Sequence, residues 1–253
     1  MWAFTVVVAL GSCFGAAAGV KGHPLQPQNE MSEWYFAQPP ITRSLLAAAF
    51  ATTVACQAGA VSPHDLYFDW SLVLAGQAWR CATCFIFMGP AFDLGLLMRL
   101  YLLWSYSQRL EEGSFHGRTA DFAWFVALGA GFLLALAAIP GWLDLHFMAE
   151  SLSFMFIQVW ARRNEAARMV IMGVLEVRAP YLPWVLMMFS ISMGAEAGEA
   201  FAGIVAGHTY YFLEDVMPIV NAAKGRGRKR VLQTPEMMYW LCGSGDEDDR
   251  QFQ

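Results

Sequence analysis

The sequence predicts an all-α polytopic membrane protein, a bundle of six transmembrane helices, and three observations support this prediction. Six apolar stretches run roughly over residues 41–61, 91–108, 120–139, 145–161, 180–195 and 199–213. Hydrophobic residues make up 57% of the chain and charged residues only 15%, against about half and a quarter in soluble domains. If each stretch crosses the bilayer, thirteen of the sixteen Lys and Arg residues fall on the same side of the membrane.

The basic residues also predict the orientation. The thirteen lie in the N-terminal arm, the second-to-third connection, the fourth-to-fifth connection and the tail. They are Lys21, Arg43, Arg109, Arg118, Arg162, Arg163, Arg168, Lys224, Arg226, Arg228, Lys229, Arg230 and Arg250. The opposite side holds only Arg80, while Arg99 and Arg178 lie within or beside apolar stretches. Because cytosolic loops are enriched in Lys and Arg, we expect both termini in the cytosol.

Helices are the expected form of these stretches. Lipid offers no partner to the backbone groups of an open sheet, and the alternation typical of a membrane barrel is weak here. The last two stretches are short: Pro180–Ala195 and Ala200–Leu213 reach about 24 and 21 Å at 1.5 Å per residue, and the bilayer core is about 30 Å thick. Two interpretations stay open. Neighbouring helices and flanking polar side chains shield the short spans, or the protein thins the membrane to ease the passage of polar chains.

A segment of about 29 residues, Ser62 to Pro90, separates the first two stretches. It carries Asp65, Asp69 and Arg80 and is therefore too polar to span, yet it is rich in aromatic residues. These are Tyr67, Phe68, Trp70, Trp79, Phe85 and Phe87. Since Trp and Tyr favour the headgroup level, we expect this segment to lie in the membrane interface.

Five separated blocks of the chain resemble one family. Gln77–Arg80 (QAWR) is similar to the Trp-Arg element of the rhomboid superfamily. The others resemble signatures of the Derlins, the rhomboid pseudoproteases of the endoplasmic reticulum. They are Leu110–Phe122, Gln158–Asn164, Ala179–Leu186, and Gly203–His208 followed by Tyr210–Asp215. The resemblance runs from about Glu33 to Thr234, with the blocks in the family's order.

The resemblance implies a rhomboid-like six-helix bundle with an interfacial loop between helices 1 and 2. It also implies a non-enzymatic component of endoplasmic-reticulum-associated degradation, which assists retrotranslocation of misfolded proteins to the cytosol from the endoplasmic reticulum membrane. The implied partners are misfolded protein substrates, a membrane ubiquitin ligase complex, an AAA ATPase, the lipid bilayer, and other subunits of a homo- or hetero-oligomer. The motif that often docks the ATPase is absent from residues 249–253, so the resemblance does not extend to direct docking.

The residues needed for rhomboid protease chemistry are missing. Such a protease needs Gly-x-Ser-Gly at the fourth helix, and residues 147–154 contain no glycine. It also needs a histidine that takes the serine proton, about one turn before the first glycine of the sixth helix. This chain has Glu199 or Ala200 there. The sequence therefore predicts a protein that is not an enzyme.

The sixth stretch holds three further candidates. Gly203 and Gly207 are spaced by four, which predicts close packing of two helices. His208 follows them, and an intramembrane histidine is a functional candidate. We expect it to bond a neighbouring helix or the backbone. The alternative is an intramembrane serine protease with an unorthodox dyad, Ser151 or Ser153 with His208.

Gln77, Trp79 and Arg80 are the candidate substrate-handling or loop-anchoring residues of the interfacial segment. The residues themselves leave two interpretations: Trp79 and Arg80 hold the loop against the bundle, or they form a snorkelling pair in an aromatic belt. The resemblance favours the first. Glu150 and Arg99 lie near helix ends, where we expect them to face headgroups; a polar groove is the alternative.

The sequence predicts no cofactor and no metal. Cys81 and Cys84 have the spacing of half a metal site without a matching second pair, so we expect them to be small apolar residues. The five cysteines form no disulfide framework. The basic run at 224–230 is expected to be solvated and to meet anionic headgroups, not nucleic acid. A small-solute transporter is disfavoured, because the chain shows no inverted repeat.

The chain divides into three parts. Residues 31–217 form the rhomboid-like membrane domain, and residues 218–253 a cytosolic tail expected to be disordered. Residues 1–30 resemble a signal peptide without its basic region, whose cleavage would conflict with the charge pattern. Three explanations stay open: translation starts at Met31, the segment is a seventh span or interfacial anchor, or it is a targeting leader. A leader for a membrane around a complex plastid gives the alternative function, Derlin-like protein import there.

Overall fold

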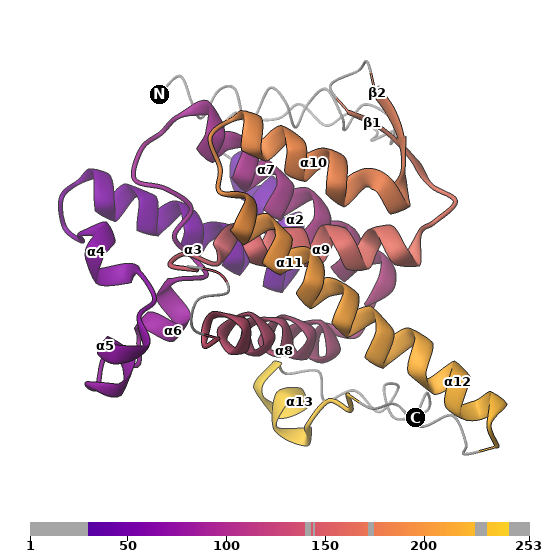
Figure 1. The fold of residues 1–253 in the computed structure, drawn as a ribbon. Helices are drawn as coiled ribbons and strands as arrows, with labels where there is room; N and C mark the ends of the chain where they lie inside the picture. Colours follow the sequence, from indigo (N-terminus) through magenta and orange to yellow (C-terminus); the bar gives the residue numbers. More distant parts are fainter. Residues whose placement is uncertain (1–29, 140–142, 144, 172–174, 226–231, 243–253) are drawn as a thin grey trace.

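The computed structural model describes residues 30–139, 143, 145–171, 175–225 and 232–242, and these are mainly helical, as predicted (Figure 1). The longer helices are α2 (Glu30–Ala37), α3 (Pro40–Gln57), α7 (Leu94–Arg109), α8 (Thr119–Ala137), α9 (Ala149–Arg163), α10 (Leu182–Ser192) and α11 (Ala197–Tyr211). The shorter ones are α4 (Pro63–Leu66), α5 (Trp70–Leu74), α6 (Arg80–Thr83), α12 (Met217–Ala223) and α13 (Glu236–Cys242). Two π-helical turns, η1 (Leu110–Ser114) and η3 (Phe212–Val216), continue α7 and α11, and a 3-10 turn, η2 (Ala179–Tyr181), precedes α10.

Each of the six apolar stretches contains one of the longer helices, and local chemistry explains where several begin or end. Pro40 opens α3, at a position where its missing N–H costs nothing. The side chain of Asp93 caps α7 by accepting a hydrogen bond from the N–H of Leu96 at 2.7 Å. Arg162 and Arg163 lie in the last turn of α9, where positive charge is favourable.

The helices differ in how well they suit a membrane crossing. Within the described parts of the chain, α8 is the one helix long and apolar enough to cross a membrane by itself, and Ala179–Ser192 is apolar but shorter. The fifth predicted stretch, 180–195, ends early as a helix, at Ser192. The six crossings therefore stay a prediction.

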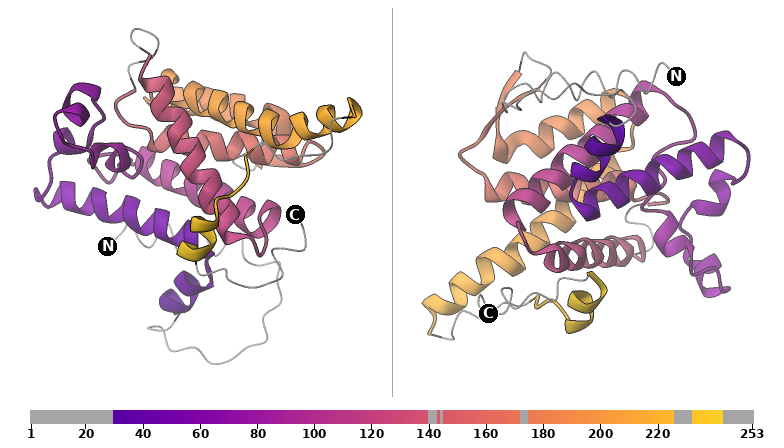
Figure 2. Two further views of the ribbon diagram at one scale, coloured as in Figure 1. Left: turned by 90° about the horizontal axis from the view of Figure 1, so that it is seen from below. Right: turned by 180° about the vertical axis from the view of Figure 1, so that it is seen from behind.

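Helix α9 lies at the centre of the bundle. It packs most extensively against α11 and also contacts α7, α8 and α10 (Figures 1 and 2). All of its residues from Ala149 to Ala161 are buried. Aromatic side chains of α8 pack against it: the ring centroid of Phe156 in α9 lies 5.9 Å from that of Phe122 and 5.6 Å from that of Phe125. α9 is thus the element against which the others are positioned.

Two features of the fold differ from the sequence-based expectation. A short antiparallel hairpin, β1 (Arg168–Ile171) and β2 (Leu175–Arg178), interrupts the all-α pattern, with Arg168 opposite Arg178. The tail was expected to be disordered from residue 218, but α12 and α13 are helical, and α13 packs against α8. The apolar run of the tail, Pro235 to Cys242, was too short to be recognised as a helix by periodicity. Residues 1–29, most of the predicted leader, lie outside the described residues.

Candidate functional site

The segment from Ser62 to Pro90 forms a lobe of three short helices, α4, α5 and α6, beside the bundle (Figure 1). Two of these helices begin with side-chain caps. Ser62 and Asp65 form a capping box on α4, and the carboxylate of Asp69 accepts hydrogen bonds from the N–H groups of Ser71 and Leu72 on α5. The hydroxyl of Ser71 also donates to the Asp69 carboxylate. This bond contributes most, and the two N–H bonds contribute less, to holding the pKa of the Asp69 carboxyl below its usual value.

Arg80 joins the parts of this lobe. Its Nη1 donates to the backbone carbonyl oxygens of His64 and Tyr67, at 2.9 Å each. Its Nε donates to Oε1 of Gln77 at 2.6 Å, and its guanidinium lies 4.8 Å from the centroid of the Tyr67 ring. Only 5% of Arg80 is exposed. A buried guanidinium with this many partners ties the chain before α5 to the chain after it, and we refer to residues 62–90 as the Arg80-anchored segment.

The structure separates the three predicted loop residues. Gln77 and Arg80 contact one another inside the segment, whereas Trp79 points outward with 56% of its surface exposed. Trp79 therefore does not anchor the loop to the rest of the chain. An exposed Trp beside a buried Arg leaves the aromatic ring available to lipid or to another polypeptide.

Two backbone hydrogen bonds attach the Arg80-anchored segment to the chain before α9. The N–H of Phe68 donates to the carbonyl of His146 at 2.8 Å, and the N–H of Met148 donates to the carbonyl of Cys84 at 2.9 Å. The Cys84 thiol is buried, and this burial raises its pKa to about 12. The segment is thus bonded to the start of the central helix, not suspended from α3 and α7 alone.

Gly203 and Gly207 lie at the contact between α11 and α9, which we call the glycine seam. A Cβ on Gly203 would collide with the carbonyl oxygen of Ser151, and one on Gly207 would lie 2.8 Å from Cβ of Gln158 and 2.9 Å from the carbonyl oxygen of Met155. Only glycine allows the two backbones to approach this closely. His208 lies on the exposed side of α11, and its imidazole makes no hydrogen bond to any described residue, so the expected bond to a neighbouring helix is not seen.

The serines of α9 do not meet a histidine. The hydroxyl of Ser151 donates to the carbonyl oxygen of Glu199 at 2.7 Å, across the glycine seam. The hydroxyl of Ser153 donates to the carbonyl oxygen of Ala149, one turn back in its own helix, at 3.1 Å. His208 lies more than two turns beyond Glu199 along α11. Within the described residues, neither serine therefore donates its proton to a histidine, as a serine–histidine dyad would require.

Glu150 is buried, with 6% of its surface exposed, and this corrects the expectation that it faces headgroups. It accepts a hydrogen bond from the hydroxyl of Ser190, which connects α9 to α10. Arg99 is half-buried in a small hollow between α7 and α10, and its buried Nε has no hydrogen-bond partner among the described residues. Polar groups of four helices, including Glu199 of α11, thus lie at one end of the bundle.

Glu111 is a further buried residue that the sequence did not single out. Its carboxylate accepts hydrogen bonds from the N–H of Ile41 at 3.0 Å, and from the N–H and hydroxyl of Thr42 at 2.8 Å each. These N–H groups belong to the first turn of α3, which has no side-chain cap of its own. The π-helical turn η1, within the block 110–122, places Glu111 there. Its function is therefore to fix α3 against α7.

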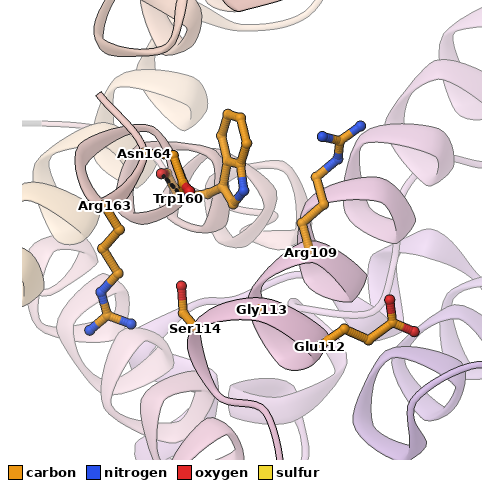
Figure 3. Close-up of a pocket in the computed structure, with 7 residues that line it drawn as sticks. All are labelled: Arg109, Glu112, Gly113, Ser114, Trp160, Arg163 and Asn164. Atoms are coloured by element: carbon orange, nitrogen blue, oxygen red, sulfur yellow. Dashed lines mark hydrogen bonds between the residues drawn. The ribbon is translucent and has the colours of Figure 1, made fainter. Parts of the chain in front are cut away.

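A polar hollow of about 480 Å³ lies at the other end of α9 (Figure 3). It is lined by Arg109, Glu112, Gly113, Ser114, Trp160, Arg163 and Asn164. The Arg109 guanidinium lies 5.5 Å from the Trp160 ring, and Arg163 donates two hydrogen bonds to Asp215, at 3.0 and 3.1 Å. None of these residues belongs to the Arg80-anchored segment or the glycine seam, so this hollow is a separate feature.

The described residues contain no group of three or more His, Cys, Asp or Glu side chains that could hold a metal ion. Cys56, Cys81, Cys84 and Cys242 are free thiols. The Arg80-anchored segment is thus a hydrogen-bonded loop from which the side chain of Trp79 points outward. It lies beside the end of the bundle that holds Glu150, at the start of α9.

Comparison with known proteins places this geometry in a family. The sequence profile of the Der1-like family matches residues 38–236. Derlin-2.1 of Arabidopsis thaliana is 39% identical over 217 residues, which cover 82% of this chain and 86% of the relative. Derlin-2.2 of the same plant is 38% identical over 217 residues with the same coverage, and Derlin-1 of Oryza sativa subsp. japonica is 35% identical over 205 residues, covering 81% of each chain.

These matches extend over nearly the whole described part of the chain, from before α3 to the start of α13. They include the Arg80-anchored segment, the turn that holds Glu111, and the glycine seam. The resemblance found in the five sequence blocks is thereby confirmed, and this chain belongs to the Der1-like family, the Derlins.

Proposed function

We propose that this protein is a non-enzymatic membrane component of endoplasmic-reticulum-associated degradation that assists the retrotranslocation of misfolded proteins to the cytosol. The observation that carries the proposal is the Arg80-anchored segment, in which a buried guanidinium fixes the backbone while Trp79 is presented outward. A rigid support for an exposed aromatic ring suits transient contact with the apolar side chains that misfolded proteins expose.

Exposed apolar side chains support a multi-pass arrangement with six crossings. Large apolar side chains are exposed on helices that are too short or not apolar enough to cross a membrane alone, as on α3, α10 and α11. They include Phe50, Val54, Trp184, Met188, Ile191 and Phe201. Exposed apolar side chains of this size on several helices are suited to contact with lipid. From the distribution of the basic residues, we infer that both termini lie on the cytosolic side of the endoplasmic reticulum membrane.

The absence of enzymatic activity is part of the proposal. Ser151 and Ser153 both donate to backbone carbonyl oxygens, and His208 is exposed on a different face of its helix. The partners that follow from such a function are misfolded substrates, a membrane ubiquitin ligase complex, an AAA ATPase that pulls, and other subunits of an oligomer.

The proposal is tested in cells that carry a misfolded glycoprotein reporter. The chain is expressed from Met1 and from Met31 with a C-terminal tag, each as wild type, Trp79→Ala and Arg80→Ala. We expect Trp79→Ala to accumulate normally and to slow reporter degradation dominantly, because it removes the presented ring and leaves the support. Arg80→Ala should slow it too, with a less stable loop.

Gly131→Ala is the matched control, since a Cβ at Gly131 meets no atom within 4 Å. An unchanged reporter half-life with both loop variants, in protein that is correctly inserted, contradicts a role in dislocation. Import of a plastid precursor is then the activity to measure with the same variants.

A further inference from the structure

The carboxylate of Asp121, at the start of α8, accepts hydrogen bonds from the C-terminal segment that ends in helix α13. Oδ1 of Asp121 accepts hydrogen bonds from the hydroxyl of Thr234 at 2.6 Å and from the hydroxyl of Tyr239 at 2.9 Å. Oδ2 of the same carboxylate accepts from Nη1 of Arg118 at 3.3 Å. Asp121 is buried, and α13 lies beside α8 (Figure 1). We call Asp121, Thr234 and Tyr239 the tail latch.

Thr234 is followed by Pro235, and the chain holds one other Ser or Thr followed by Pro, Ser62. Thr234 is half-buried, and its neighbours Gln233 and Glu236 are exposed. Proline restricts the residue before it to extended backbone, the form in which protein kinases read their substrates. The acceptor hydroxyl of this motif is therefore the same group that closes the tail latch.

We propose that Thr234 is a phosphorylation site for a proline-directed Ser/Thr protein kinase and that its phosphorylation releases α13 from α8. The kinase acts on Thr234 when the latch opens transiently, and the phosphate then prevents closure. The location of this site in the cytosol rests on the orientation given under the proposed function.

The chemistry is simple. Oγ1 of Thr234 forms a bond to the γ-phosphorus of ATP, the bond from that phosphorus to the β–γ bridging oxygen breaks, ADP leaves, and the hydroxyl proton passes to the kinase's base. The ester oxygen then has no hydrogen to donate to Asp121. At pH 7 the phosphate also carries a charge of about −1.5 to −2, and it would lie against a carboxylate.

The surroundings of the latch do not favour the phosphorylated form. A separation of 2.6 Å between Oγ1 and Oδ1 leaves no room for a phosphorus atom. Among the described residues, Arg118 is the cation that pairs with Asp121, and it also donates to the carbonyl oxygen of Ser114 at 2.8 Å. Phosphorylation therefore removes the hydrogen bond from Thr234 to Asp121 and places two negative charges against each other. This repulsion favours the release of α13 from α8.

The test uses the full chain, purified in detergent and treated with a proline-directed kinase and ATP. Phosphate is located by mass spectrometry, and hydrogen exchange is measured over residues 236–242 before and after treatment. We expect phosphate on Thr234 and at least roughly a hundredfold faster exchange of α13, as for the loss of two hydrogen bonds to a charged group. Pro235→Ala should prevent phosphorylation without changing exchange, and Thr234→Ala should raise exchange without any kinase.

Absence of phosphate on Thr234, with a Ser-Pro peptide modified in the same tube, overturns the proposal. Phosphate without faster exchange of α13 overturns the release. Sealed microsomes with the kinase added outside then test the membrane orientation independently of whether Thr234 can be phosphorylated. We expect phosphate on Thr234 but not on Ser62 until the membrane is permeabilised. The reverse pattern contradicts the proposed orientation and overturns a cytosolic kinase as the modifying enzyme.

Discussion

The guanidinium of Arg80 contacts Tyr67 twice, through a 2.9 Å hydrogen bond to its carbonyl oxygen and a distance of 4.8 Å to the centroid of its ring. Replacing Arg80 with Ala removes this cation and leaves the part-buried carbonyl oxygens of His64 and Tyr67 without its donor groups. We expect a loss of about 3 kcal/mol from the stability of the Arg80-anchored segment, measured as hydrogen exchange over residues 62–90.

Trp79→Ala is the comparison for that change. Because 56% of Trp79 is exposed, we expect the stability of residues 62–90 in this variant, measured by hydrogen exchange, to stay within about 0.5 kcal/mol of the wild type. Equal effects of the two substitutions would mean that Trp79 also supports the loop, contrary to its outward orientation.

The glycine seam makes a second prediction. Gly203→Ala places a methyl group against the carbonyl oxygen of Ser151, and backbone cannot rotate away as a side chain can. We expect α9 and α11 to separate slightly, at a cost of about 1–3 kcal/mol, seen as a lower thermal midpoint in nanodiscs. Gly131→Ala in α8 has open space at its Cβ and should be neutral, or more stable by about 0.5–1 kcal/mol. If the thermal midpoint fell equally in Gly203→Ala and Gly131→Ala, the loss of stability would not come from the close approach of α9 and α11.

Glu111 gives a third prediction. Glu111→Ala leaves the first N–H groups of α3 and the hydroxyl of Thr42 without their acceptor, and we expect a loss of about 3 kcal/mol. Glu111→Gln keeps one carbonyl oxygen and should lose less. The neighbouring Glu112 is exposed, so Glu112→Ala should change the unfolding free energy by no more than about 0.5 kcal/mol. Chemical denaturation in detergent measures all three, and a small effect of Glu111→Ala would refute the capping role.

A fourth prediction concerns serine chemistry. Ser151 and Ser153 should not react with a fluorophosphonate, because each donates its proton to a backbone carbonyl oxygen and lacks a nearby base. Labelling of either serine that disappears in His208→Ala would establish the unorthodox dyad and overturn the non-enzymatic function. An active rhomboid protease in the same detergent is the positive control.

The fifth prediction concerns Cys84, whose pKa burial raises to about 12. At pH 8 the reactive thiolate is then about one part in ten thousand, so iodoacetamide should leave Cys84 unmodified until the protein unfolds. Since the folded pKa is higher than the unfolded one of about 8.5, burial of this thiol stabilises the fold below that pH, and the contribution is lost as the pH rises toward 12. Rapid labelling of Cys84 in folded protein at pH 8 would show that the segment opens.

The sequence predicted more of the helices than of their contacts. The third stretch, 120–139, nearly coincides with α8, because a long uniformly apolar run has one form in lipid. The sequence also singled out Arg80, through the resemblance of residues 77–80 to the Trp-Arg element of the rhomboid superfamily. It did not predict that Trp79, the adjacent residue, points away, because orientation within one short helix depends on what packs around it.

The polar contacts between helices could not be predicted from the sequence for a different reason. Glu111 and Thr42 are separated by 69 residues, and Thr234 and Asp121 by 113 residues, so no local pattern connects them. Glu150 resembled a headgroup-facing residue because its position near a helix end was visible, while Ser190 of another helix was not. The tail helix α13 was missed because a segment of seven residues carries too little periodicity to be recognised, and its contacts with α8 and Asp121 lie far away in sequence.

The sequence by itself determined the helical class, the positions of the six apolar helices and the membership of the Der1-like family, because apolar runs and motif order are local properties of the chain. Only the tertiary structure decided which face each helix buries, where Arg80, Glu111 and Asp121 find their partners, and that neither serine of α9 meets His208. Those outcomes depend on distances between segments far apart in sequence, which packing around α9 sets.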